Sequence, residues 1–230
     1  MMTLSRYSSY TGLRPEIFRR IGQDRRNVLD VGCSNGALGA AVKRRQGARV
    51  TGVEYDEELA GEAVGRLDRV IAGDLNELPR ILGQLDGPYD CMVFADVLEH
   101  LSDPWGCLTA FSEHLAPDGE VVISLPNVGH LSTFTAVFLR RTWPRRHRGL
   151  HDSTHLRWFA RNDISELLSG ASLEPLSWKR SQRFVDAPVV VNRLALLVGW
   201  LPGLRDLLTY QFVVVARRAD TMAIETSVSA

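Results

Sequence analysis

The 230-residue chain lacks the cysteine pattern of a disulfide-bonded or cysteine-ligated protein. It has three cysteines, Cys33, Cys91 and Cys107, an odd number scattered along the sequence. This spacing predicts neither a disulfide framework nor a cysteine metal site, and it favours a reducing compartment. We therefore expect a cytoplasmic protein.

Long apolar runs and an excess of one charge are also missing. No apolar run free of charges and proline approaches the roughly 18 residues of a membrane-spanning helix. The start of the sequence, with Arg6, Tyr7 and Tyr10, has no apolar signal segment. Basic (Lys+Arg) and acidic (Asp+Glu) residues number 27 each, so no net charge points to nucleic acid. At 45% hydrophobic residues, one domain with one substantial core is the default expectation.

What the sequence does contain is an alternation of short apolar runs and helix-like segments. Strands are predicted at 28–31, 49–54, 69–72, 89–95 and 120–125, and helices at 37–46, 56–65 and 103–115. This alternation predicts an α/β, Rossmann-like fold with a doubly wound, mostly parallel sheet. A turn at 116–119 is expected to lead into the fifth strand.

The alternation breaks after Pro126. The stretch 127–159 is long, aromatic and basic, and we interpret it as a lid and substrate insertion with a short amphipathic helix. A helix at 162–168, a strand at 173–179, a helical insertion at 181–208 and an antiparallel last strand at 210–217 are expected to follow. Residues 1–217 would form one domain, and 218–230 a flexible tail.

The most informative stretch runs from Asn27 to Gly36. An apolar strand reaches the carboxylate of Asp30, a turn that carries Gly32 and Gly36 follows, and a helix begins directly after it. A strand, a glycine turn and a helix form the place where open α/β sheets bind nucleotides. Asp30 would repel a pyrophosphate and hold an ammonium group. Ser34 stands where the dinucleotide fingerprint has its second glycine.

This acidic-x-Gly-x-x-x-Gly stretch resembles the first motif of the class I S-adenosylmethionine-dependent methyltransferases. Four further pieces follow in the expected order: Thr51 to Asp56 with its acid Glu54, Ala72 to Leu75, Phe94 to Leu101, and Leu115 to Glu120. The resemblance covers roughly residues 1–217. The stretches Leu125 to His130 and Thr154 to Phe159 resemble the subgroup of ubiquinone-pathway O-methyltransferases and many sugar or natural-product methyltransferases.

The resemblance implies that S-adenosylmethionine is bound at the ends of the strands. Glu54 would bind the two ribose hydroxyls, Tyr55 would lie against the adenine, and Asp74 would accept a hydrogen bond from the adenine amino group. The alternative for Asp74 is to cap a helix at 76–82, a role that can coexist with the adenine contact. An acid at Glu54 is also what an NAD-dependent dehydrogenase requires. The expected cofactor-binding residues are Asp30, Gly32, Cys33, Gly36, Glu54, Tyr55, Asp74, Leu75, Ala95, Asp96 and His100.

A hydroxyl acceptor would need a base near the methyl group, and histidine is the side chain best matched to neutral pH. His155 is the first choice, with Asp152 as its orienting partner and His130 as the next candidate base. A structural hydrogen-bonding role is the alternative for each histidine. No metal site is predicted, because the histidines His147, His151 and His155 lie beside several arginines.

The sequence thus predicts an enzyme that methylates a hydroxyl of a small molecule, such as a sugar or secondary metabolite. The alternatives are an N-methyltransferase acting on an amine and a cofactor-binding accessory module without activity. Zero net charge and the stretch 95–98, which is not an Asn/Asp-Pro-Pro-Tyr/Phe motif, disfavour an RNA or protein substrate bound through the arginines. The arginines from Arg140 to Arg148 could hold an anionic acceptor, form a rim for a membrane-associated or carrier-bound acceptor, or be a solvated face. The apolar stretch 189–208 is expected to be core or the face of a homodimer.

Overall fold

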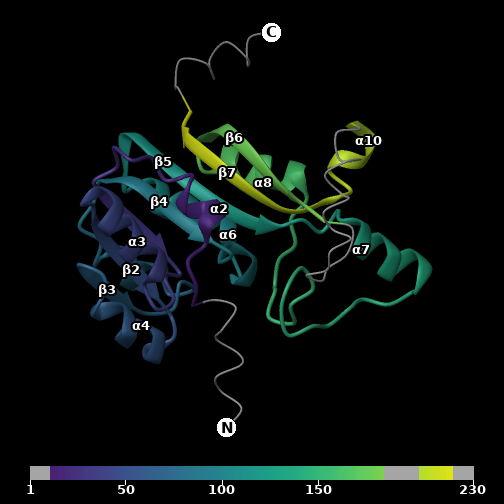
Figure 1. Cartoon of the computed structure of the whole chain (residues 1–230), viewed down its shortest axis with the longest axis horizontal. Helices are drawn as coiled ribbons and strands as arrows, with labels where there is room; N and C mark the ends of the chain where they lie inside the picture. Colours follow the sequence, from purple (N-terminus) through teal and green to yellow (C-terminus); the bar gives the residue numbers. More distant parts are fainter. Residues whose placement is uncertain (1–10, 184–201, 220–230) are drawn as a thin grey trace.

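Seven strands form one sheet in the computed structural model, which describes residues 11–183 and 202–219 (Figure 1). The strands are β1 (Asn27–Val31), β2 (Arg49–Glu54), β3 (Arg69–Ala72), β4 (Tyr89–Ala95), β5 (Leu115–Pro126), β6 (Leu173–Gln182) and β7 (Thr209–Arg218). Their order across the sheet is β3-β2-β1-β4-β5-β7-β6. Strands β1 to β5 pair in parallel, and β7 is antiparallel to both of its neighbours. The predicted mostly parallel sheet with an antiparallel last strand is confirmed.

The sheet has a switch point between β1 and β4, where the strand order reverses. Val31 of β1 lies beside Phe94 of β4 at the carboxyl ends of both strands. Ligands of open α/β sheets bind in the crevice outside the carboxyl ends of the strands at such a point. The glycine turn that follows β1 and the loop that follows β4 therefore lie next to each other, as the sequence motifs require.

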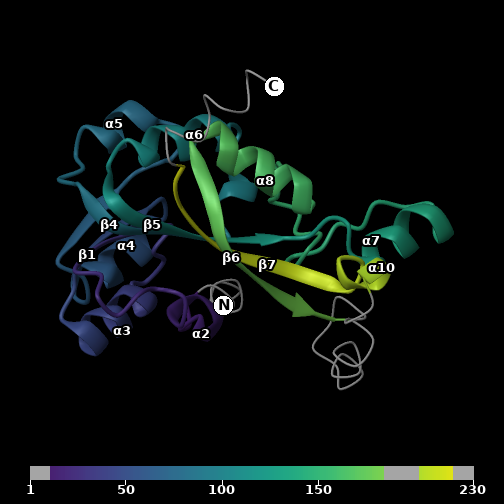
Figure 2. The same ribbon diagram turned by 90° about the horizontal axis from the view of Figure 1, so that it is seen from above.

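Helices cover both faces of the sheet (Figure 2). They are α2 (Pro15–Phe18), α3 (Ala37–Gln46), α4 (Glu57–Val64), α5 (Leu78–Leu82), α6 (Pro104–Ser112), α7 (Leu131–Phe134), α8 (Arg161–Gly170) and α10 (Pro202–Arg205), with the short helical turns η1 (Leu98–His100) and η2 (Thr135–Leu139). Residues of α2, α3 and α4 share one buried cluster with alternate residues of the strands. Residues of α5, α6 and α8 share the other. The two apolar layers hold the carboxyl ends of the strands in fixed register.

Several boundaries differ from the sequence expectation. The turn expected at 116–119 is a bulge inside β5, because Leu115 already pairs with Tyr89 before Glu120 pairs with Cys91. Helix α6 therefore ends at Ser112, before the predicted end near residue 115. Its predicted start is confirmed: Asp103 caps the helix by accepting a hydrogen bond from the Gly106 amide at 3.0 Å.

The C-terminal boundaries also need correction. Ser181 and Gln182, expected in a helical insertion, belong to β6, where they pair with Gln211 and Thr209. Arg218, expected in a flexible tail, is the end of β7 and pairs with Leu173. The rest of the tail from 220 onward, residues 1–10 and the apolar stretch at 184–201 lie outside the described residues. No helix in the described part of the chain is long and apolar enough to cross a membrane.

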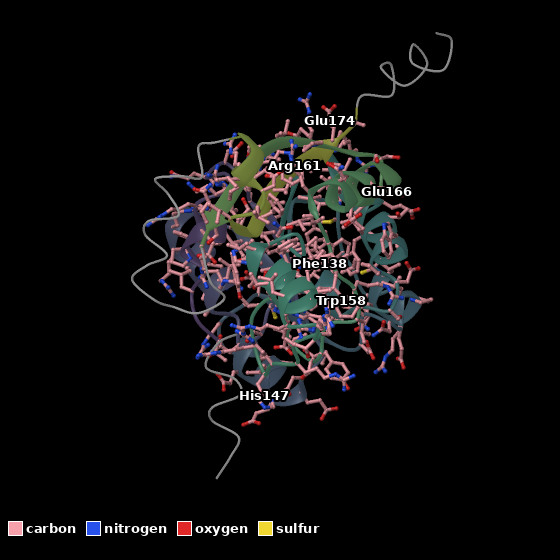
Figure 3. The ribbon with its side chains drawn as sticks, turned by 90° about the vertical axis from the view of Figure 1, so that its right-hand side faces the viewer. Phe138, His147, Trp158, Arg161, Glu166 and Glu174 are labelled. Atoms are coloured by element: carbon pink, nitrogen blue, oxygen red, sulfur yellow. The ribbon has the colours of Figure 1, made fainter. Side chains whose placement is uncertain are left out.

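The stretch after β5 leaves the body of the molecule. A short helix is confirmed there, because α7 continues into η2, and the pair projects away from the sheet in both views (Figures 1 and 2). Phe138 and His147 lie on the surface of this end (Figure 3), and Phe138 is 67% exposed. The later part of the stretch is built into the body instead, since Leu150 and Phe159 are buried.

Candidate cofactor and acceptor site

The glycine turn after β1 has the conformation that only glycine adopts readily. Gly32 and Gly36 have φ values of 71° and 76°. A Cβ on Gly32 would lie 2.3 Å from the Val97 Cγ2 atom, so the loop after β4 packs directly on the turn. The Cys33 side chain packs on Gly52 of β2, since a Cβ added to Gly52 would lie only 2.5 Å from Cys33 Sγ.

Glu54 joins the glycine turn to the start of α4. Its Oε2 atom accepts a hydrogen bond from the Ser34 amide at 2.7 Å. Its Oε1 atom accepts from the amides of Tyr55 and Asp56 at 3.0 and 2.9 Å. Backbone amides thus fix the carboxylate, and each oxygen retains room for a further donor. This is the geometry needed for a carboxylate that binds two neighbouring hydroxyl groups.

Tyr55 and Asp74 border an open hollow of about 270 Å³ beside the ends of β2 and β3. Tyr55 is 71% exposed, so its ring is free to receive a flat apolar group. Asp74 Oδ1 accepts hydrogen bonds from the amide and the side-chain nitrogen of Asn76 at 2.8 and 2.9 Å. Asp74 caps no helix, because α5 begins at Leu78 with Glu77 at its N-cap position, so the capping alternative is wrong. The second carboxylate oxygen of Asp74 leaves capacity for another donor.

Asp30 is buried with one oxygen unsatisfied. It accepts a backbone hydrogen bond from Gly39 in α3, while its Oδ2 atom has no partner. Burial and the nearby charge of Glu54 raise the pKa of Asp30 to about 7. A buried carboxylate under a glycine turn is destabilised unless positive charge approaches, so this site favours a cationic ligand.

Asp96 anchors the loop after β4. Its Oδ1 atom accepts hydrogen bonds from Ser124 Oγ at 2.7 Å and Gln211 Nε2 at 2.6 Å. Its Oδ2 atom forms an ion pair with Arg14 at 2.6 Å. Asp96 has a φ of 57°, a conformation that this network holds in place. The side chain is engaged in the structure, so its predicted contact with the cofactor would come mainly from the backbone beside Ala95.

The end of the insertion is fastened to the turn after β4. The amides of Leu156 and Arg157 donate to the Glu99 carbonyl oxygen at 2.8 and 3.0 Å. As a result, the rings of His100 and His155 meet edge to face, with centroids 4.8 Å apart. Burial lowers the pKa of both histidines, and the neighbouring His100 lowers that of His155 further. Both imidazoles are therefore neutral near pH 7.

Glu99 lies in one cluster with His100 and His155, and the sequence did not indicate it as a site residue. It is 1% exposed, and burial together with the charge of Asp96 raises its pKa well above the usual range. Its partner His155 comes from a distant part of the chain, so no local spacing could show the set. The one available signal was a glutamate directly before His100 in the turn that follows a strand.

His130 and Asp152 are held by local contacts. His130 Nδ1 accepts a hydrogen bond from the Ser132 amide at 3.1 Å, and its Nε2 atom lies 2.7 Å from the Arg183 carbonyl oxygen. Both ring nitrogens are thus occupied, which supports the structural alternative for His130. Asp152 Oδ1 accepts from the amide and hydroxyl of Thr154 at 2.9 and 2.7 Å. Its role as an orienting partner of His155 stays a prediction.

Comparison with known proteins agrees with this geometry. The family model described as "Methyltransferase domain" matches residues 6–177. The ubiquinone biosynthesis O-methyltransferase of Pseudomonas paraeruginosa is 30% identical over 143 residues, covering 59% of this chain and 60% of that protein. The protein of the same name from Xylella fastidiosa is 27% identical over 210 residues, covering 80% and 78%. The chain spans about 60% of the length of the first curated relatives that it matches.

Solved structures share the fold at low identity. A SAM-dependent methyltransferase from Archaeoglobus fulgidus superposes with a TM-score of 0.64 at 17% identity, covering 92% of this chain and 97% of that one. Magnesium protoporphyrin IX methyltransferase from Synechocystis with bound SAH superposes with a TM-score of 0.59 at 17% identity, covering 89% and 80%. The sheet, the glycine turn and the family match together define the class, and the chain belongs to the methyltransferase domain family. The predicted resemblance to class I S-adenosylmethionine-dependent methyltransferases is confirmed.

The residues present fit S-adenosylmethionine. The unsatisfied carboxylate oxygen of Asp30 suits a ligand with ammonium and sulfonium charges. Glu54 offers both carboxylate oxygens beside the glycine turn, and the hollow between Tyr55 and Asp74 offers a place for a base. The predicted roles of the individual residues stay predictions.

Proposed function

We propose that this chain transfers a methyl group to a hydroxyl of a small molecule. The relatives named above are O-methyltransferases, which supports oxygen as the methylated atom. The observation that supports the proposal most is the cluster of Glu99, His100 and His155 next to the loop that packs on the glycine turn. A hydroxyl acceptor requires groups that handle its proton, and this cluster supplies them.

The chemistry divides between the two halves of the site. When bound, S-adenosylmethionine supplies an electrophilic sulfonium methyl group. Glu54 and Asp30 would hold and orient that donor, so that positioning contributes much of the rate. His155 would act on the acceptor hydroxyl, because its ring is buried and neutral beside the loop after β4. The surrounding insertion would keep bulk water away from the sulfonium methyl group.

The exposed arginines of the insertion suit an acceptor with a phosphate or carboxylate group. Arg145 and Arg146 are exposed, and guanidinium groups bind such anions with two parallel hydrogen bonds. Cys33, Cys91 and Cys107 are free and buried, which supports a reducing compartment such as the cytoplasm. A homodimer and a carrier-bound or membrane-associated acceptor stay open within this proposal.

The test is methyl transfer from S-adenosylmethionine to matched sets of phenols, glycosides and amines, followed through release of S-adenosylhomocysteine. We expect a hydroxyl compound to be the substrate. We expect His155→Ala to lower turnover by about 100-fold or more while the affinity for S-adenosylmethionine stays unchanged. His147→Ala, at an exposed position, is the control. Transfer to amines alone, with unchanged turnover in His155→Ala, would contradict the proposal.

A further inference from the structure

Two side chains of the turn after β4 and one from the end of the insertion converge on one another. Among the described residues, Glu99, His100 and His155 each offer one ligand atom, and these atoms all lie within 4.8 Å of one another. Glu99 is 1% exposed and His155 is 8% exposed. The Glu99 Oε2 atom is buried and has no hydrogen-bond partner. A buried carboxylate oxygen left unsatisfied is costly, so the position calls for a further group.

The histidine rings are oriented as metal ligands are. His100 Nδ1 lies 3.3 Å from the Thr154 carbonyl oxygen, and His155 Nδ1 lies 3.2 Å from the Leu150 carbonyl oxygen. In metal sites, a histidine almost always donates one ring N–H to a carbonyl or carboxylate and binds the ion through its other nitrogen. The two carbonyl contacts thus leave Nε2 of each ring to bind an ion.

We propose that Glu99, His100 and His155 bind a divalent transition-metal ion of the zinc type. Two imidazoles and one carboxylate form a ligand set used by catalytic zinc, which keeps its fourth position open. Ligand atoms around such an ion are about 3.4 Å apart, so a small rotation of the three side chains would close the set. The backbone bonds from Leu156 and Arg157 to Glu99 hold the two segments together without the ion.

The charges around the cluster also favour a cation. Asp152 and Asp96 lie close enough to interact with Glu99 electrostatically. Arg14 opposes them, but it forms ion pairs with Asp96 and Glu16. A divalent ion would compensate the carboxylates and satisfy Glu99 Oε2.

The consequence for catalysis rests on the proposed function. A hydroxyl that reaches the open position of the ion has a lowered pKa and deprotonates more easily. In the transfer, the O–H bond breaks and the proton passes to water, while the oxygen forms a bond to the methyl carbon. The carbon–sulfur bond breaks and leaves its electron pair on sulfur. His155 then acts as a ligand, and its loss removes the ion from the site.

The test is titration of the chelator-treated full chain with Co²⁺, which reports its ligand geometry by visible absorption. We expect one Co²⁺ per chain, displaced by Zn²⁺. Glu99→Gln keeps the size of the side chain and should weaken Co²⁺ binding by at least tenfold, as should His155→Ala. His147→Ala should bind as the wild type does. No absorption change, or equal binding by Glu99→Gln and the wild type, would overturn the site.

A second set of measurements separates this inference from the proposed function. Calorimetry with S-adenosylmethionine reports whether Glu99→Gln is folded and holds its donor. Methyl transfer is then measured before and after removal of metal by a chelator. Loss of transfer on chelation, restored by Zn²⁺ or Mn²⁺, would support the metal site. Co²⁺ binding without methyl transfer to any hydroxyl compound would overturn the proposed function and leave the metal site standing.

Discussion

Val97 fills the space that a side chain on Gly32 would occupy. A Cβ at Gly32 would lie 2.3 Å from Val97 Cγ2, and Gly32 has a φ of 71°. The two residues follow β1 and β4, the strands at which the order of the sheet reverses. The absence of a side chain at one position therefore sets how closely the second loop can approach the glycine turn.

Gly32→Ala should destabilise the chain by about 2–4 kcal/mol, from overpacking against Val97 and from left-handed backbone strain. Urea unfolding measures the change. Adding Val97→Ala should restore the stability lost to overpacking, whereas the loss from backbone strain at residue 32 should remain. Gly61→Ala in α4 is the matched control, because no atom lies within 4 Å of its Cβ position. That control should be neutral or slightly stabilising. Equal stabilities of the wild type and Gly32→Ala would contradict the packing argument.

Asp30 should make the ligand-free protein less stable as the pH rises. Its pKa is about 7 in the folded chain, whereas the ordinary pKa of an aspartate, which applies in the unfolded chain, is 3.8. The folded state thus binds more protons than the unfolded state between these values. Asp30 therefore contributes to the free energy of unfolding in full below about pH 4, and this contribution is lost as the pH rises through about 7.

Thermal unfolding at about pH 5 and about pH 8 tests this prediction. Asp30→Asn cannot ionise, so its melting temperature should fall less between the two conditions than that of the wild type. Asp118→Asn, at an exposed position, is the control and should follow the wild type. Identical pH profiles for the wild type and Asp30→Asn would show that Asp30 does not titrate in this range.

Two parts of the insertion should exchange their amide hydrogens at different rates. The Leu150 amide donates to the Tyr210 hydroxyl at 3.0 Å, and Thr133 Oγ1 lies 3.0 Å from His151 Nε2. These contacts predict protected amides from Leu150 onward without any ligand. The exposed stretch from Phe138 to Arg145 comes before the Arg146 amide, which donates to the His151 carbonyl oxygen at 2.9 Å. This stretch should exchange quickly and become protected when the acceptor is added. Equal protection of both parts without acceptor would rule out the lid hypothesis.

Replacing Arg145 and Arg146 by alanine should raise the KM for an anionic acceptor and leave S-adenosylmethionine binding unchanged. The reason is that both side chains are exposed on the insertion, whereas the predicted cofactor contacts come from the glycine turn and Glu54. Steady-state kinetics with varied acceptor measures the effect. Arg44→Ala, exposed on α3, is the control. An unchanged KM in the double variant would assign the arginines to a solvated face.

Much of this fold follows from local sequence. The strand from Arg49 to Glu54 and the helix from Ala37 to Gln46 were predictable residue by residue, because apolar periodicity and glycine punctuation mark their ends. The bulge in β5 was not, since the pairing of Leu115 with Tyr89 depends on a partner strand. Glu99 could not be predicted for the same reason, because only the folded chain brings His155 close to it.

Calorimetric titration with S-adenosylmethionine tests the central claim most directly. We expect binding of S-adenosylmethionine and S-adenosylhomocysteine in the micromolar range and no binding of NAD. Glu54→Ala should weaken binding by about 1–3 kcal/mol, the value of a lost charged acceptor, while Glu58→Ala, exposed on α4, should bind as the wild type does. Tight binding of NAD with no heat from S-adenosylmethionine would contradict the account.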